Sequence, residues 1–133
     1  MKISTRGRYA VRIMVELSRI QENEYVSLKE LAEKQEIPFK YIEKTISLLV
    51  KNSMIESRHG KGGGYRLVRA PEDYPIGEIL RITEGDMAPV ACLSCNGQGC
   101  DRRENCKTLP MWKEFNELIT GYFNSKTLRD LII

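Results

Sequence analysis

The sequence predicts a mainly helical fold with one small β-hairpin, within the α+β class. Apolar residues recur at helical spacing through residues 6–52 and again near the end of the chain. Two short strand-like runs flank a glycine-rich stretch at residues 59–64. At 133 residues the chain is long enough to bury one compact core with an appended element.

The first element is an amphipathic helix, expected over residues 6–21. Ile13, Met14 and Leu17 fall on one stripe of this segment, whereas Arg12 and other charged residues fall off it. An apolar stripe opposite a charged face is typical of a helix that packs on a core.

Two shorter helices follow, joined by a tight turn. Ser27 and Glu30 form the sequence pattern of a capping box, so a second helix begins there. Pro38 suits the start of a third helix, which we expect to run to about Asn52 and to bury Ile42 and its neighbours one turn apart. Two short helices joined in this way are typical of a helix-turn-helix.

A basic hairpin comes next. The runs 54–58 and 65–69 favour strands, and the glycines from Gly60 to Gly64 permit a flexible tip. No helix follows these glycines to supply an N-terminal dipole, which argues against a phosphate-binding loop. A basic hairpin directly after a helix-turn-helix is typical of the wing of a winged helix. Residues 1–74 are therefore expected to form a winged helix-turn-helix DNA-binding domain.

Residues 75–133 are expected to hold a connector helix, a cysteine-rich segment (86–107) and a long helix (108–124). The long helix carries a broad apolar stripe that needs a partner, either its own core or a second copy of the chain. We favour the second copy, and hence a dimerisation helix. The stripe contains Met111, Trp112, Phe115, Leu118, Ile119, Tyr122 and Phe123.

All four cysteines, Cys92, Cys95, Cys100 and Cys106, lie within fifteen residues in a polar segment, which argues against core packing. The chain opens without a signal peptide and holds no stretch of membrane-spanning length, so we expect a cytoplasmic protein with reduced thiols. Four thiolates suit a 2Fe–2S or 4Fe–4S cluster, a tetrahedral zinc ion, or thiol redox chemistry. The spacing lacks the paired Cys-x2-Cys of a zinc ribbon, which favours the cluster.

The charge is unevenly distributed. Residues 1–70 carry 14 Lys or Arg against 8 Asp or Glu, whereas residues 71–133 carry 7 against 10. The basic half is suited to a polyanion, and double-stranded DNA is the obvious candidate.

Together these features resemble the IscR-type family of iron–sulfur-cluster-dependent transcription regulators over essentially the whole chain. The resemblance is carried by Ser4–Ala10, Tyr41–Glu43, Gly60–Tyr65, Trp112 and the position of the cysteines. It implies a homodimer held by the long helices, a roughly palindromic DNA site, and sensing of a cluster, with 2Fe–2S favoured. By analogy, the regulated genes would include those for cluster biogenesis.

One departure from the family concerns the ligands. Close members have three cysteines and a histidine three residues after the last, and that position here is Leu109. The usual three resemble Cys92, Cys100 and Cys106, and Cys95 is additional. Either Cys95 completes an all-cysteine site or the fourth ligand is exchangeable; we favour Cys95.

The predicted DNA contacts fall in three places: the recognition helix, the wing and the N-terminal segment. Side chains near the start of a recognition helix reach base edges in the major groove, and Glu43 can accept a hydrogen bond from cytosine N4. The wing is suited to an adjacent minor groove or to phosphate. The candidates are Lys2, Arg8, Phe39, Lys40, Tyr41, Glu43, Lys44, Arg58, His59 and Lys61.

These observations predict a DNA-binding regulator that senses an iron–sulfur cluster, as activator or repressor. The alternatives are a winged-helix repressor that uses zinc or thiol oxidation, and a small iron–sulfur electron-transfer module. An enzyme is not expected, because one histidine and no convincing acid/base pair leave little for catalysis.

Overall fold

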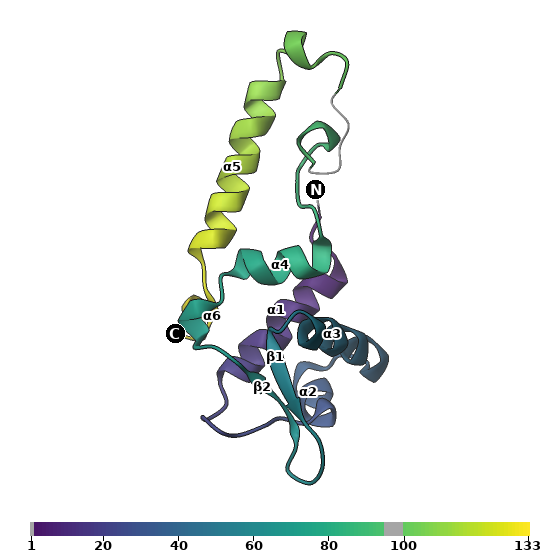
Figure 1. Cartoon of the computed structure of the whole chain (residues 1–133), viewed down its shortest axis with the longest axis vertical. Coiled ribbons are helices and arrows are strands. Elements are labelled where there is room, and N and C mark those ends of the chain that lie inside the picture. The colour runs from purple at the N-terminus through teal and green to yellow at the C-terminus, as the bar shows by residue number, and fades with distance from the viewer. Residues whose placement is uncertain (1, 95–99) are drawn as a thin grey trace.

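The structure is a computed structural model that describes residues 2–94 and 100–133. Within those ranges the chain forms α-helices, one antiparallel two-stranded sheet and short 3-10 turns (Figure 1). The helices and strands are α1 Thr5–Ser18, α2 Leu28–Gln35, α3 Phe39–Lys51, β1 Ile55–Arg58, β2 Gly64–Leu67, α4 Ile76–Glu84, α5 Leu109–Ser125 and α6 Leu128–Ile132. The 3-10 turns are Pro71–Asp73, Ala91–Leu93 and Arg103–Asn105.

The three N-terminal helices form the predicted helix-turn-helix core. Ser27 accepts a hydrogen bond from the Glu30 amide at the start of α2, as the capping pattern predicted. The turn into α3 passes through Glu36 in the left-handed region, and Pro38 then occupies the N-cap position. Helix α1 ends at Ser18, three residues earlier than expected, because the chain turns toward α2 through residues 19–24.

The hairpin is antiparallel and is anchored at its base. Ile55 pairs with Leu67, and Arg58 pairs with Gly64. Val26 bridges to Tyr65 on the other side of β2. Gly64 has φ +146°, and a Cβ there would collide with the Val26 carbonyl, so only glycine allows this close approach. The wing is therefore tied to the segment that precedes α2.

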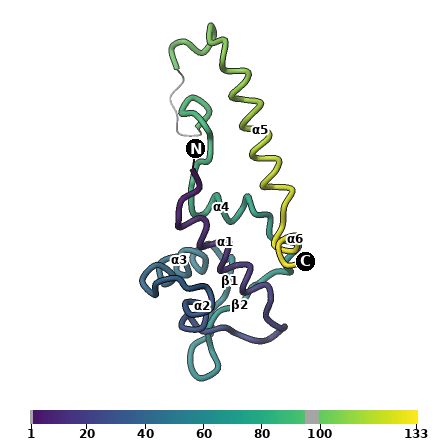
Figure 2. The backbone as a smooth tube through the Cα atoms, turned by 180° about the vertical axis from the view of Figure 1, so that it is seen from behind, coloured from purple at the N-terminus to yellow at the C-terminus, as the bar shows by residue number. Residues whose placement is uncertain are grey.

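The C-terminal half returns to the same core. Helix α4 crosses α1, and after α5 the short helix α6 packs back with Leu128 fully buried (Figure 1). Helix α5 itself projects away from the helix-turn-helix body, as both views show (Figure 2). Trp112, Ile119 and Phe123 are half-buried, so the predicted apolar stripe is only partly covered.

The predicted fold class is confirmed: a mainly helical chain with a two-stranded hairpin and a long C-terminal helix. In the described part of the chain, no helix is both long and apolar enough to span a bilayer.

Candidate DNA interface and cysteine segment

Helix α3 presents its polar face to solvent. Ile42, Ile46 and Leu49 are buried against the core, which orients the other side of the helix outward. The first turn of α3 carries no acidic residue. The predicted contacts Phe39, Lys40, Tyr41, Glu43 and Lys44 are all exposed.

The wing carries the predicted residues Arg58, His59 and Lys61, all exposed. The Arg58 guanidinium lies 5.7 Å from the centroid of the Tyr25 ring, and that of Arg66 lies 4.6 Å from it. Tyr25 therefore supports the base of the wing through cation–π contacts. The sequence singled out neither Tyr25 nor Arg66, because no local pattern marks a contact between segments so far apart in the chain.

The two N-terminal candidates, Arg8 and Lys2, lie in different places. Arg8 is exposed and donates a hydrogen bond to the Thr5 hydroxyl at 3.0 Å. Tyr9 packs edge-on against Tyr41, with 6.4 Å between ring centroids, so α1 and α3 begin side by side. Lys2 lies elsewhere, beside residues 84–89 that lead into the cysteine segment.

The cysteine segment lies between α4 and α5, at the end of the molecule opposite the wing (Figure 1). Among its described thiols, which form no disulfide, Cys92 and Cys106 are half-buried and Cys100 is exposed. Cys95 lies outside the described residues. His59, on the wing, is therefore remote from the cysteines of its own chain.

Cys106 sits just before α5, two residues ahead of the N-cap residue Thr108. Its sulfur lies 3.3 Å from the Thr108 hydroxyl. Hydrogen bonds from that hydroxyl, and from the backbone N–H groups of Thr108 and Leu109, lower the pKa of the Cys106 thiol because they stabilise the thiolate. Leu109, at the position of the family histidine, is buried and apolar and offers no ligand atom.

The cysteine segment supplies sulfur ligands for a metal centre. Cysteine thiolates are the ligands of iron–sulfur clusters and also of structural zinc, so the chemistry of the segment fits both. Among residues 2–94 and 100–133, no three His, Cys, Asp or Glu side chains lie close enough together to hold a metal ion. The thiols thus suit a metal centre by their chemistry and by their place in the chain. In the described residues, however, their sulfur atoms are not close enough together to hold a metal ion.

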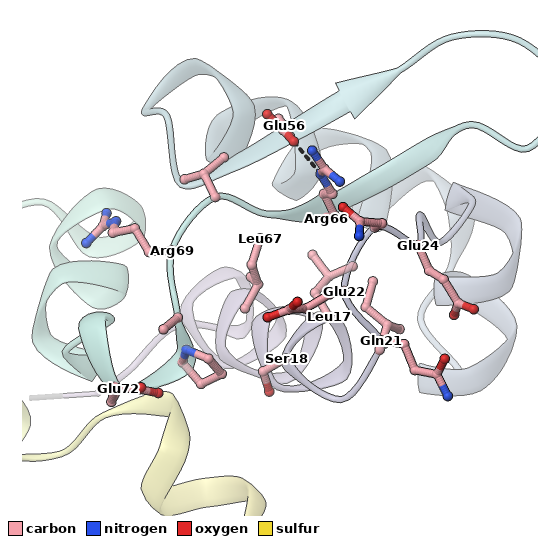
Figure 3. Close-up of a pocket in the computed structure, with 15 residues that line it drawn as sticks. Leu17, Ser18, Gln21, Glu22, Glu24, Glu56, Arg66, Leu67, Arg69 and Glu72 are labelled. Carbon is pink, nitrogen blue, oxygen red and sulfur yellow. Dashed lines mark hydrogen bonds and ion pairs between the residues drawn. The ribbon is translucent and has the colours of Figure 1, made fainter.

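A groove of about 700 Å³ lies between the end of α1 and the segment from β2 to the following 3-10 turn (Figure 3). Among its charged side chains, Glu56, Arg66 and Arg69 are paired. Glu56 and Arg66 point toward one another and form an ion pair, and Arg69 pairs with Glu78 outside the groove. In the described residues, no buried side-chain polar atom lacks a hydrogen-bond partner. The remaining carboxylates, those of Glu22, Glu24 and Glu72, are exposed to solvent, so the described residues of the groove supply no buried group for catalysis.

A helix-turn-helix with a wing and an outward-facing basic helix defines the class of winged-helix DNA-binding proteins. Residues 3–133 match the family model described as "Rrf2: Iron-dependent Transcriptional regulator". The chain belongs to the Rrf2 family, and it is a DNA-binding transcription regulator and not an enzyme.

Two curated relatives illustrate the match. The chain is 32% identical over 133 residues to "HTH-type transcriptional regulator IscR" of Klebsiella pneumoniae (strain 342), covering 99% of this chain and 80% of that protein. It is 36% identical over 132 residues to "Protein rrf2" of Nitratidesulfovibrio vulgaris, covering 99% and 87%.

Solved structures agree with the fold. CymR, the global cysteine regulator of B. subtilis, matches with a TM-score of 0.84 and 31% identity, covering 99% of this chain and 96% of that one. T. potens IscR matches with a TM-score of 0.79 and 32% identity, covering 99% and 86%. Both an IscR and a cysteine regulator thus share this architecture.

Proposed function

We propose that the protein is a homodimeric regulator that senses an iron–sulfur cluster held by Cys92, Cys95, Cys100 and Cys106. The observation that carries the proposal is the position of these four thiols, gathered in one segment between a helix of the core and the projecting helix α5. The family's iron-dependent description supports a metal centre, and the cysteine spacing favours an iron–sulfur cluster over zinc.

The cluster, when bound, supplies a redox-active centre whose gain or loss changes the charge and order of this segment. The chain's own residues provide the connection to DNA. Glu84, the last residue of α4, accepts hydrogen bonds from the Ser4 amide and hydroxyl at 2.8 and 2.6 Å. The Asp86 carboxylate accepts from the Ala88 amide at 2.9 Å and from the Ser94 hydroxyl. Through these contacts, a change in the cysteine segment would reach the start of α1. Helix α3 begins beside that point, so the change would also reach the proposed DNA contacts.

A homodimer is proposed because part of the apolar stripe of α5 is exposed to solvent. Its members recur at spacings of four, three and four residues, which places them on one helix face. This face is turned away from α4 and would be covered by the same face of a second copy, in a two-fold arrangement. The stripe contains Met111, Phe115, Leu118 and Tyr122.

Two reading heads related by a two-fold axis would bind a roughly palindromic site on double-stranded DNA. The predicted contacts on α3, the wing and Arg8 belong to this interface. By the resemblance described above, the target genes would include those for cluster assembly, in the cytoplasm where thiols stay reduced.

The cluster is tested by anaerobic purification followed by absorption spectroscopy and by iron, sulfide and zinc analysis. We expect visible charge-transfer bands with equal iron and sulfide. Cys95→Ser should lower cluster occupancy at least tenfold, as should Cys92→Ser, whereas Ser47→Ala, an exposed control on α3, should retain it. A colourless protein that carries only zinc after reconstitution would overturn the proposal. An unchanged cluster in Cys95→Ser would show that Cys95 is not a ligand, and would leave the rest of the proposal standing.

A second candidate is a thiol- or zinc-based sensor on the same fold. The likeness to a cysteine regulator and the free thiols of Cys92, Cys100 and Cys106 favour it. The same metal and sulfide analysis separates the two candidates. The electron-transfer module is set aside, because the chain belongs to a family of transcription regulators.

A further inference from the structure

Two aromatic rings are exposed in the first turn of α3, in a surface that is otherwise polar. Phe39 is 52% exposed and Tyr41 is 54% exposed, while Ile42 beside them is fully buried. Scattered apolar groups are normal on a protein surface. These two, however, lie where a recognition helix meets the edges of bases.

The two rings have different surroundings. Tyr41 is held by Tyr9, which in turn lies under the Arg12 guanidinium at 5.5 Å. Its position is therefore explained by packing between α1 and α3. Phe39 has no aromatic or cation–π partner in the described part of the chain, and it does not belong to the core or to the shell packed against it. Folding accounts for Tyr41 and leaves Phe39 unexplained.

Phe39 shares a helix face with Glu43, because residues four apart lie one above the other. Lys40 and Lys44 form a second such pair alongside. The lysines suit phosphates and the carboxylate suits cytosine N4, but a phenyl ring can make neither contact. The apolar group that a base edge offers in the major groove is the 5-methyl group of thymine.

We propose that Phe39 is a specificity-determining residue that packs on a thymine methyl group in the major groove. The inference rests on the proposed placement of α3 in that groove. One helical turn rises about 5.4 Å and one base-pair step about 3.4 Å, so the thymine lies one or two base pairs from the pair that Glu43 reads. The same methyl group occurs on 5-methylcytosine, which the test distinguishes.

The test uses a duplex selected from a random library with the purified full chain. Each thymine is replaced singly by uracil, which removes the methyl group and keeps the pairing. Burial of one methyl group changes Kd about fourfold. For the wild type, we expect replacement of thymine by uracil to weaken DNA binding about fourfold at one position per half-site. For Phe39→Ala, the same replacement should change Kd less than 1.5-fold.

Phe39→Leu, which keeps an apolar side chain, should retain most of the discrimination, and Val68→Ala, an exposed apolar control outside α3, should retain all of it. A duplex with 5-methylcytosine at that position should recover less affinity than thymine, because it presents an N4 amino donor in the major groove where thymine presents the O4 acceptor. Equal loss in wild type and Phe39→Ala, or no loss at any thymine, would overturn the inference. A wild type that selects no sequence would instead contradict the proposed DNA reading itself.

Discussion

The hydroxyl of Tyr74 makes three hydrogen bonds inside the protein. It donates to the Met54 carbonyl at 2.7 Å and accepts from the amides of Val68 and Arg69 at 2.9 and 3.1 Å. Burial raises the pKa of the Tyr74 phenol, so the hydroxyl stays protonated and can donate at neutral pH. This one side chain therefore joins both ends of the hairpin to the start of the C-terminal half.

Removing this hydroxyl should destabilise the whole fold. Tyr74→Phe leaves the Met54 carbonyl and two amides without their partner, which costs about 1–3 kcal/mol for buried groups. We expect a loss of about 2 kcal/mol in the free energy of unfolding, measured by urea denaturation. Tyr41→Phe, which is exposed and keeps the ring contact with Tyr9, is the matched control and should change stability by less than about 0.5 kcal/mol.

The ion pair between Arg69 and Glu78 makes stability depend on acid pH. The Arg69 guanidinium donates to both carboxylate oxygens, at 2.9 and 3.0 Å, and this lowers the pKa of Glu78. A depressed folded pKa adds stability that is present above the unfolded pKa and is lost as the pH falls through the folded value.

We therefore expect the wild type to be more stable than Glu78→Gln at pH 7, by about 1 kcal/mol since the pair is partly exposed. The difference should shrink as the pH falls below about 4.5 and vanish once the carboxylate is protonated. Denaturation of both proteins from pH 3 to pH 7 measures it. A difference that is constant with pH would contradict the assignment.

At the scale of elements, the Glu84 carboxylate of α4 links α4 to the start of α1 by its hydrogen bonds to Ser4. It lies where a side chain at position 7 of α1 would begin. Gly7 lies in the first turn of α1, and a Cβ there would collide with the Glu84 carboxylate that bonds Ser4. Neither helix by itself requires glycine at this position. The constraint comes from the Glu84 side chain, whose carboxylate lies against Gly7.

Gly7→Ala should therefore destabilise the protein by about 1 kcal/mol, although alanine is the better helix former by a similar amount. The effect should reverse in the Glu84→Ala background, where alanine at position 7 should stabilise by about 0.5 kcal/mol. Thermal unfolding of the four proteins completes the cycle. The same sign in both backgrounds would show that the Glu84 contact is not the reason for the glycine.

At the scale of the whole molecule, the proposed dimer rests on the projecting helix α5. Leu118 is 65% exposed at the centre of the uncovered stripe, which is unusual for a leucine with apolar neighbours on both sides. A second copy seated there would remove it from water.

Leu118→Glu should raise the dimer dissociation constant about 100-fold or more, because a charge would be buried without a partner. Analytical ultracentrifugation measures the change. Thr120→Glu adds the same charge to the other side of α5 and should leave the dimer intact. A monomeric wild type, or equal weakening in both variants, would contradict a dimer formed through this face.

The helices and the hairpin could be predicted closely, because their signals are local. The apolar spacing of α3 and the capping residue Ser27 act within a few residues, and the structure places both as expected. The end of α1 was wrong by three residues, since apolar spacing continues to Ile20 while the backbone already turns. The number and position of the four cysteines are likewise visible in the chain.

What the sequence by itself determined is the winged-helix class and a segment of thiols beside a long apolar helix. The tertiary structure alone decided that Tyr74 joins the hairpin to α4, that Glu84 reaches Ser4, and that one face of α5 is half-covered while the other is free. These contacts link residues far apart in the chain. Their existence depends on the distance and angle at which packed helices meet, and no local periodicity encodes that geometry.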